Sequence, residues 1–356
     1  MKICFVAAAL TGGGLERVVS VLANQLAERN DLEVSILLMT RQPIMYEISP
    51  KVLLIQPDKR EFSSNRLMNS VLSSRFVRAE VKKIKPDHLI SFGERYNSFV
   101  VFSCLFLGIK LHVSNRASPL SSLVGFRGFF NPIFYRFCKT VHVQTQLAIK
   151  LMAKKYKGSN LVVVPNPFDL PESLPSFEDR KNIILNVGSI GGKKNQDLLL
   201  IFFNQIKDSI DNSWELHFVG DGPKAKQLQE KVNQLGLQNR VKLLGHRKDV
   251  LKLYQTAKVF AFTSTSEGFP NALGEAMAYG LSAISFDCIT GPAELIDDKI
   301  NGFLMPVDEH EYYTNQLQVL LNDAALQKQF SEAAIQKMKN FEISNVTQKF
   351  LQTLIS

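Results

Sequence analysis

Two carboxylates eight residues apart lie in the segment 264–280, which reads STSEGFPNALGEAMAYG. Glu267 follows a short apolar run, and Glu275 lies on a helix expected to begin near Pro270, because proline is favoured at a helix start. Carboxylates accept strong hydrogen bonds from hydroxyl groups, so such a pair could hold a polyol at two points. The helix start would also offer N–H groups to an anion, those of Asn271, Ala272 and Leu273. The alternative, a capping Glu267 and a solvated Glu275, must also explain the Gly-Phe-Pro loop.

Two glycine-rich loops could bind phosphate. The segment 187–195, VGSIGGKKN, places Lys193 and Lys194 beside glycines at an expected helix start, which suits a phosphate or diphosphate. The segment 11–17, TGGGLER, contains Gly13 and Gly14, which allow the backbone to approach an anion closely. The second loop is neither a dinucleotide fingerprint nor a P-loop, because the third glycine of the first and the GK[ST] of the second are missing. Solvated lysines and a βα turn without a ligand are the structural alternatives.

Short apolar runs alternate with amphipathic helical segments along the whole chain, a pattern typical of βαβ units and parallel sheets. Four prolines between 165 and 175 interrupt it and predict a linker near 165–181. Two helical stretches, at 308–322 and 324–354, are expected to end the chain. We therefore predict an α/β fold of two doubly wound, Rossmann-like domains that face each other across a cleft, with ligands beyond the carboxyl ends of the strands.

Charge distinguishes the two halves. The 356 residues include 42 Lys+Arg and 33 Asp+Glu, a formal net charge of +9. Residues 1–170 hold 23 basic and 11 acidic side chains, whereas residues 171–356 hold 19 and 22. The basic half is therefore expected to meet a local anionic partner. Four widely spaced cysteines and the absence of an HExxH motif favour neither disulfides nor a metal site, and no signal peptide or membrane-spanning segment is expected.

The order of motifs resembles family 4 glycosyltransferases, which have the GT-B fold and transfer sugars from nucleotide donors with retention at the anomeric carbon. The resemblance extends over nearly the whole chain, and the segments that carry it are GGGLERVV, VVVPNP, VGS…KKNQDLLL, FVGDGP, LLGHRKDV, SEGFPNALGEAMAYG and GPAELIDDKINGFL. It implies an N-terminal acceptor-side domain at 1–170 and a donor domain at 171–340. The terminal helix, at 341–356, would pack back on the first domain.

The resemblance also implies roles for individual residues. Glu267 would contact the donor sugar near the reacting carbon, and Glu275, in the second position of the family's Glu-x7-Glu motif, would hold the ribose hydroxyls. Lys194 would neutralise the donor diphosphate in place of a metal, so that no cofactor is expected besides the nucleotide sugar. The remaining expected substrate contacts lie near the diphosphate, the base or the acceptor, and they are Gly13, Gly14, Lys193, His246, Arg247, Asn271, Ala272, Leu273 and Arg116.

Two positions depart from the family pattern. Ser189 stands where many members carry an arginine that contacts the diphosphate, and Lys193 or another basic residue would have to compensate. The stretch VSNR at 113–116 lacks the histidine that many members have near the acceptor, and His112 is interpreted as structural. The GGLER and SNR loops are similar to those of members that transfer N-acetylhexosamines in surface-glycan assembly. For the reaction we favour front-face attack, in which the donor phosphate takes the acceptor proton.

The basic half also contains aromatic residues, as in LVGFRGFFNPIFYRFCK at 123–139, and a basic run, RFVRAEVKKIK at 75–85. Such combinations suit an anionic bilayer surface or a polyprenyl-diphosphate-linked acceptor. Nucleic acid is not expected, because no recognised binding module accompanies them, and buried aromatics with solvated basic faces are the structural alternative. We thus expect a cytoplasmic enzyme, peripheral on the inner face of the plasma membrane, that moves an N-acetylhexosamine from a UDP-sugar to a lipid-linked or surface-glycan acceptor. A sugar-nucleotide epimerase or an inactive nucleotide-sugar binding protein are the alternatives.

Overall fold

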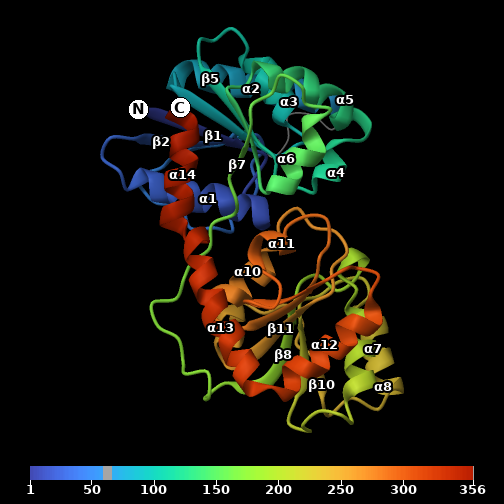
Figure 1. Ribbon diagram of the computed structural model, residues 1–356. Coiled ribbons are helices and arrows are strands. Elements are labelled where there is room, and N and C mark those ends of the chain that lie inside the picture. Colours follow the sequence, from blue (N-terminus) through green and yellow to red (C-terminus); the bar gives the residue numbers. More distant parts are fainter. Residues whose placement is uncertain (59–65, 356) are drawn as a thin grey trace. The chain divides into compact units, whose positions relative to one another are not determined.

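The computed structural model describes residues 1–58 and 66–355. It divides into unit 1, which comprises Met1–Pro167 and Ile343–Ser356, and unit 2, which comprises Phe168–Glu342. Each unit contains a parallel sheet covered by helices, as predicted from the alternation of apolar runs and amphipathic segments (Figure 1). In the described residues, no helix is both long and apolar enough to cross a membrane.

Unit 1 is built on a seven-stranded parallel sheet with the order β3-β2-β1-β4-β5-β6-β7. Its strands are β1 (Lys2–Ala7), β2 (Glu33–Leu38), β3 (Leu53–Ile55), β4 (His88–Phe92), β5 (Lys110–Ser114), β6 (Thr140–Val143) and β7 (Leu161–Val163). The central strands β1, β4 and β5 are buried over nearly their whole length, because helices cover both faces of the sheet. Strand order reverses between β1 and β4, and at such a switch point the loops leave a crevice for ligands.

The helices of unit 1 are α1 (Gly14–Ala27), α2 (Arg66–Ile84), α3 (Asn97–Cys104), α4 (Pro119–Ser122), α5 (Gly125–Phe134), α6 (Gln146–Ala153), α14 (Ile343–Ile355) and a 3-10 turn at Tyr135–Phe137. Helix α14 packs beside α1 (Figure 1), and the ring of Phe350 lies 5.8 Å from that of Phe5. The last helix of the chain thus completes the core built by its first strand.

Unit 2 has a six-stranded parallel sheet with the order β10-β9-β8-β11-β12-β13. The strands are β8 (Lys181–Val187), β9 (Glu215–Val219), β10 (Val241–Leu243), β11 (Ala257–Phe262), β12 (Ser282–Phe286) and β13 (Gly302–Met305). The helices are α7 (Gln196–Ile206), α8 (Ala225–Gln234), α9 (Val250–Thr256), α10 (Asn271–Ala278), α11 (Pro292–Leu295), α12 (His310–Asn322) and α13 (Ala324–Met338), with 3-10 turns at Gly192–Lys194 and Lys339–Phe341. Here the switch point lies between β8 and β11.

One expected helix is divided in two. The sequence predicts a continuous helical stretch over 324–354, but α13 ends at Met338 and α14 begins only at Ile343. Between them the carbonyl of Phe341 accepts a hydrogen bond of 2.8 Å from the N–H of Phe168. The break falls where the chain leaves unit 2 and re-enters unit 1, so the fold interrupts a segment whose local spacing favours a helix throughout.

Candidate functional site

The switch point of unit 2 carries an ion pair between two residues that the sequence analysis singled out. The Nζ of Lys194 lies 2.7 Å from the Oε1 of Glu267. Lys194 comes from the loop after β8 and Glu267 from the loop after β11, two neighbouring strands whose carboxyl ends meet at one edge of the sheet. The ammonium also lies 5.4 Å from the centre of the Phe262 ring, within the range of a cation–π contact. Strand order therefore brings together residues 73 positions apart.

The loop that carries Lys194 is shaped by its backbone and by one buried amide. Asn195 adopts the left-handed conformation, with φ of 52°, a region that asparagine tolerates better than most residues. The side chain of Gln196 donates to the carbonyl of Ser189 and accepts from the N–H of Gly191, at 3.1 and 3.2 Å. The carbonyl of Lys193 accepts from the N–H of Thr265, at 2.9 Å. These bonds fasten the loop to itself and to the loop of Glu267.

Glu267 is held by the segment that follows β12. Its N–H donates to the carbonyl of Ile289, and its carbonyl accepts from both the N–H and the hydroxyl of Thr290. Burial raises the pKa of the nearby Cys288 thiol to about 12, and the charge of Glu267 acts in the same direction. The thiol is therefore neutral at physiological pH and is no nucleophile. The hydrogen bonds to Ile289 and Thr290 fix the backbone of Glu267.

Glu275 lies in α10, and its carboxylate accepts a hydrogen bond of 3.2 Å from the hydroxyl of the buried Tyr254 in α9. Helix α10 packs closely on the start of unit 2, because a Cβ at Gly274 would lie 2.3 Å from the ring of Phe168. The helix was expected to begin near Pro270, and it begins at Asn271, with Pro270 as its N-cap. The N–H of Asn271, which was expected to face a ligand, donates to the carbonyl of Phe269 at 3.0 Å. Ala272 and Leu273 follow in the first turn.

The other expected contacts in unit 2 are exposed. Lys193 lies beside Lys194 on the same loop. His246 and Arg247 follow β10, on the loop where the carbonyl of Gly245 accepts from the N–H of Gly220 at 2.8 Å. The guanidinium of Arg247 forms a bidentate pair with Asp249, at 2.7 and 2.8 Å.

In unit 1, Gly13 and Gly14 lie where β1 is joined to α1, at the switch point of that sheet. The hydroxyl of Tyr46 bridges the N–H and the carbonyl of Gly13, with both distances 2.8 Å. Arg116 lies in the interior. Its guanidinium donates to the hydroxyl of Ser114, the carbonyls of Val164 and Pro165 and the side chain of Asn166. Burial lowers the pKa of Arg116 to about 10, and it remains charged at neutral pH. These hydrogen bonds brace the end of the sheet.

Sequence reasoning missed the residues that position the site. Tyr254 and Thr290 lie outside the motifs, and each supports a loop or a carboxylate from another part of unit 2. Gln196 lies within the segment KKNQDLLL, but no role was predicted for it in holding its own loop. A hydroxyl or amide among apolar positions is a weak signal, because burial is visible only once the fold is known. The sequence predicted the residues that these side chains hold, but it did not predict the side chains themselves.

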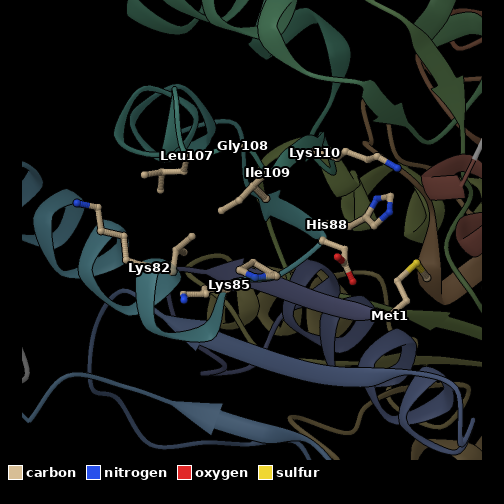
Figure 2. Close-up of a pocket in the computed structure, with 11 residues that line it drawn as sticks. Met1, Lys82, Lys85, His88, Leu107, Gly108, Ile109 and Lys110 are labelled. Carbon is tan, nitrogen blue, oxygen red and sulfur yellow. The ribbon is translucent and has the colours of Figure 1, made fainter.

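A separate concavity of about 630 Å³ opens at the amino-terminal ends of β1, β4 and β5 (Figure 2). Lys82, Lys85 and Lys110 line it, but their ammonium groups lie apart around the pocket and do not converge on one point (Figure 2). It lies at the edge of the sheet opposite to Gly13 and Gly14, so it is not part of the candidate site. Within 1–58 and 66–355, no three His, Cys, Asp or Glu side chains are grouped to hold a metal ion.

Known proteins resemble this chain in sequence and in fold. Residues 172–337 match the family described as glycosyl transferases group 1. The amylovoran biosynthesis glycosyltransferase AmsD of Erwinia amylovora is 30% identical over 338 residues, which cover 92% of each chain. A Campylobacter jejuni enzyme named GalNAc-alpha-(1->4)-GalNAc-alpha-(1->3)-diNAcBac-PP-undecaprenol alpha-1,4-N-acetyl-D-galactosaminyltransferase is 27% identical over 99% of this chain and 98% of its own.

Among solved structures, Anabaena HepE in complex with UDP and glucose superposes with a TM-score of 0.81 at 19% identity, over 100% of this chain and 99% of HepE. That likeness shows the fold, which is the two-unit α/β architecture called GT-B. Taken with the AmsD match over 92% of both chains and the family match over unit 2, it leads to one conclusion: this chain belongs to the group 1 glycosyltransferases.

Proposed function

We propose that this glycosyltransferase is a retaining, metal-independent member of family 4 that transfers an N-acetylhexosamine from a UDP-sugar. The observation that carries the proposal is the Lys194–Glu267 pair at the switch point of unit 2. An ammonium there can balance the charge of a diphosphate, and the carboxylate beside it can accept a hydrogen bond from a sugar hydroxyl. The UDP bound to HepE supports a uridine donor, and the galactosaminyltransferase of C. jejuni supports the sugar class.

The other expected contacts of unit 2 bind the remaining parts of the donor. Glu275, held by Tyr254, binds the ribose hydroxyls. The first turn of α10, at Ala272 and Leu273, faces an anionic group of the donor, and the loop of His246 and Arg247 borders the base. Lys193 supplies the second positive charge that an arginine at position 189 would otherwise provide. A Lys193→Ala variant that binds UDP more weakly than the parent, and regains affinity when Ser189→Arg is added, would support this last assignment, and a Lys193→Ala variant with unchanged affinity would contradict it.

The reaction follows from these positions. The acceptor hydroxyl attacks the anomeric carbon from the face on which the diphosphate leaves, and the bond between that carbon and the phosphate oxygen breaks. The leaving phosphate oxygen takes the proton of the hydroxyl, so that the products are the α-glycoside and UDP. Lys194 releases Glu267 and stabilises the charge that develops on the diphosphate. Glu267 is then available to the transferred sugar.

For the acceptor we propose a polyprenyl-diphosphate-linked glycan, like the undecaprenol-linked glycan in the name of the C. jejuni relative. The surface of unit 1 supports a membrane-bound acceptor. Residues 66–158 contain 16 Lys and Arg but only 3 Asp and Glu, and the exposed side chains there include Phe102, Phe106 and Phe129, which are 62%, 96% and 66% exposed. A groove of about 470 Å³ between α2 and α3 is lined by Val71, Arg75, Arg78 and Phe102, among others. Apolar side chains beside cations suit an anionic bilayer surface.

Binding to the inner face of the plasma membrane is thus part of the proposal, and vesicle flotation tests it. We expect the full chain to float with vesicles that contain phosphatidylglycerol at low salt and to be released as salt is raised. Replacement of Phe102 and Phe106 by serine should reduce flotation, whereas Val319→Ser, at an exposed apolar position of unit 2, should not. Equal flotation of both variants, or none by the parent, would contradict the membrane proposal.

The transfer proposal is tested by product analysis. We expect UDP-N-acetylgalactosamine and the lipid-linked acceptor of the C. jejuni relative to give an α-linked product without added divalent metal and in the presence of EDTA. Anomeric configuration is read by NMR. A β-linked product would contradict retention, activity only with metal would contradict the role of Lys194, and epimerised donor without transfer would favour an epimerase.

A further inference from the structure

The two sheets have the same order in their first four strands, 3-2-1-4, which allows their switch points to be compared. In unit 2 the loop after the strand across the switch point, β11, carries Glu267. In unit 1 the corresponding strand is β4, and two residues after it lies Glu94. Gly93, with φ of +106°, turns the chain there, and a Cβ on it would lie 3.5 Å from Leu15 at the start of α1. Glu94 therefore lies at the edge of unit 1 where β1 and β4 leave a crevice.

Glu94 is buried, with 5% of the residue exposed, and its carboxylate accepts few hydrogen bonds. Its Oε1 accepts a hydrogen bond of 2.7 Å from the N–H of Ala117, and in the described residues it has no ion pair. An ionised carboxylate offers about four acceptor positions, so one backbone N–H leaves most of its capacity unused. Burial of a charge is unfavourable unless other groups compensate. The charge of Glu94 does raise the pKa of Arg116 against the lowering by burial, which places a cation in its neighbourhood.

The loop of Glu94 is fixed by a buried polar network. The side chain of Asn131 donates to the carbonyl of Glu94 at 3.1 Å and accepts from the hydroxyl of Ser98. The side chain of Asn97 donates to Asn115 and to Tyr135, at 3.2 and 3.0 Å. Such a network is costly unless it is satisfied, and it rigidifies the groups it connects. It joins the loops after β4 and β5 and fixes the backbone of Glu94, while the N–H of Ala117 holds the carboxylate.

The residues that follow Glu94 offer contact area. Arg95 is exposed, and Tyr96 is 38% exposed at the start of α3. A tyrosine presents an apolar ring with a polar end, which suits a ligand with both apolar faces and hydroxyl groups. A carboxylate with unused acceptor positions, two residues before such a ring in the same loop, suits a saccharide better than a phosphate, which the negative charge of Glu94 would repel.

We propose that Glu94 binds a hydroxyl group of the acceptor saccharide and that the loop 93–97 forms the acceptor subsite of unit 1. The assignment rests on the proposed glycosyl transfer. It makes Glu94 a determinant of acceptor affinity and leaves donor binding to unit 2. Loss of the carboxylate should raise the KM for the acceptor without changing the hydrolysis of the donor by water.

The test uses the full chain and three variants. Glu94→Gln keeps an oxygen for the N–H of Ala117 and removes the charge, and Glu94→Ala removes both. Glu33→Gln, an exposed carboxylate at the opposite edge of the same sheet, is the matched control. With UDP-N-acetylgalactosamine and the lipid-linked acceptor, Glu94→Gln should raise the acceptor KM at least about tenfold, as expected for the loss of a charge-assisted hydrogen bond. Donor hydrolysis without acceptor, the donor KM and the unfolding temperature should stay within error of the parent.

Two results would overturn the assignment. An acceptor KM unchanged in Glu94→Gln would remove Glu94 from the subsite. A parallel fall in transfer, donor hydrolysis and unfolding temperature would show a purely structural carboxylate. A second measurement needs no turnover: saturation-transfer NMR with methyl N-acetyl-α-galactosaminide should show contact with the parent and with Glu33→Gln but not with Glu94→Gln. If the parent transfers no sugar to the acceptor, the proposed function fails and this measurement alone decides the subsite. If the parent shows no saccharide contact, the subsite fails.

Discussion

Lys194 and Glu267 neutralise each other in the ligand-free chain, and this explains how a lysine and a carboxylate can coexist at the edge of the sheet. Their side chains are 30% and 13% exposed, so the pair is partly shielded from water. A diphosphate has more negative charge than one carboxylate, so it attracts the ammonium of Lys194 more strongly than Glu267 does. Under the proposed function the diphosphate would take the place of Glu267 at the ammonium, while the carbonyl of Lys194 accepts a hydrogen bond of 3.0 Å from the hydroxyl of Thr263.

At this scale we expect Lys194→Ala to weaken the binding of UDP by about tenfold to a hundredfold, because a hydrogen bond to a charged group contributes about 1.5–3 kcal/mol. Titration calorimetry with UDP measures the change. Lys226→Ala, at an exposed position of α8, is the control and should bind like the parent. Equal affinity of both variants would remove Lys194 from the diphosphate site.

Tyr254 offers a finer test of the role of Glu275. Tyr254→Phe removes the hydroxyl that donates to the carboxylate and should weaken UDP binding severalfold, as expected for a neutral hydrogen bond of about 1 kcal/mol. Pyrophosphate lacks the ribose and should bind the variant and the parent equally. A loss that is the same for both ligands would place Glu275 away from the ribose.

At the scale of elements, close packing fixes the start of α10. Gly274 lies inside this helix, and its missing Cβ makes room for the ring of Phe168. The sequence predicted the helix and both carboxylates, because proline, spacing and motif are local signals. It did not predict that a residue from the linker region packs under the helix, because that contact joins positions more than 100 residues apart. Tyr254 and Thr290 were missed because their contacts with Glu275 and Glu267, 21 and 23 residues away, depend on how the elements pack.

Gly274→Ala separates local preference from packing. Helix propensity alone predicts stabilisation by about 0.5–1 kcal/mol, whereas overlap with the buried ring predicts a loss of about 1–3 kcal/mol. We expect the loss in the free energy of unfolding, measured by denaturant titration. The double variant Phe168→Ala, Gly274→Ala should show less than additive destabilisation, because the ring is then absent. A stabilised single variant would contradict the packing described above.

Three histidines on adjacent strands form another element-scale feature. The Nδ1 of His88 lies 3.0 Å from the Nε2 of His112. The hydroxyl of Thr140 bridges His112 to His142, and His142 is also hydrogen-bonded to the hydroxyl of Thr353 in α14. Burial lowers the pKa of all three, that of His112 to about 3. The charges of Lys110 and Lys139 act in the same direction on His88 and His112, as does that of Arg116 on His142, whereas Asp87 opposes it at His88.

These lowered pKa values predict acid sensitivity of unit 1. The folded chain keeps the rings neutral, while in the unfolded chain they take up protons below the ordinary pKa of 6.5. Stability is therefore full above pH 6.5 and is lost as the pH falls from there towards the folded pKa values. Unfolding at pH 7.5 and 5.0 should show a lower midpoint at pH 5.0, and NMR of the ring nitrogens should show neutral His112 at both. Titration of the His112 ring near pH 6.5 would contradict the burial of the three histidines.

At the scale of the whole molecule, the chain leaves unit 1 at Pro167 and returns to it at Ile343. The doubly wound fold was predictable because strand and helix periods alternate clearly, but the interruption between α13 and α14 was not, since no proline or glycine marks it. The return is needed because α14 fills the core of unit 1 with Val346, Phe350 and Leu354, each at most 1% exposed. Both ends of the sequence therefore contribute to one hydrophobic core.

This predicts that a change at the last helix destabilises the first strand. Phe350→Ala should lower the free energy of unfolding of unit 1 by about 3–5 kcal/mol, the range for loss of a buried phenylalanine. Hydrogen exchange of the β1 amides should become faster to the same degree. Lys349→Ala, at the exposed neighbouring position, is the control. Unchanged exchange in Phe350→Ala would show that α14 does not support the core.

Glu267 and Lys194 are the central residues of the proposed donor site. The most direct measurement is the release of UDP from UDP-N-acetylgalactosamine by the full chain with the lipid-linked acceptor, compared among the parent, Glu267→Ala and Glu230→Ala, an exposed carboxylate of α8. We predict that the parent and Glu230→Ala release UDP with transfer to the acceptor, and that Glu267→Ala does so at least about a hundredfold more slowly, since one preorganised group at a reacting centre contributes about 2.7–4 kcal/mol. Transfer by Glu267→Ala at the parent rate would contradict the account.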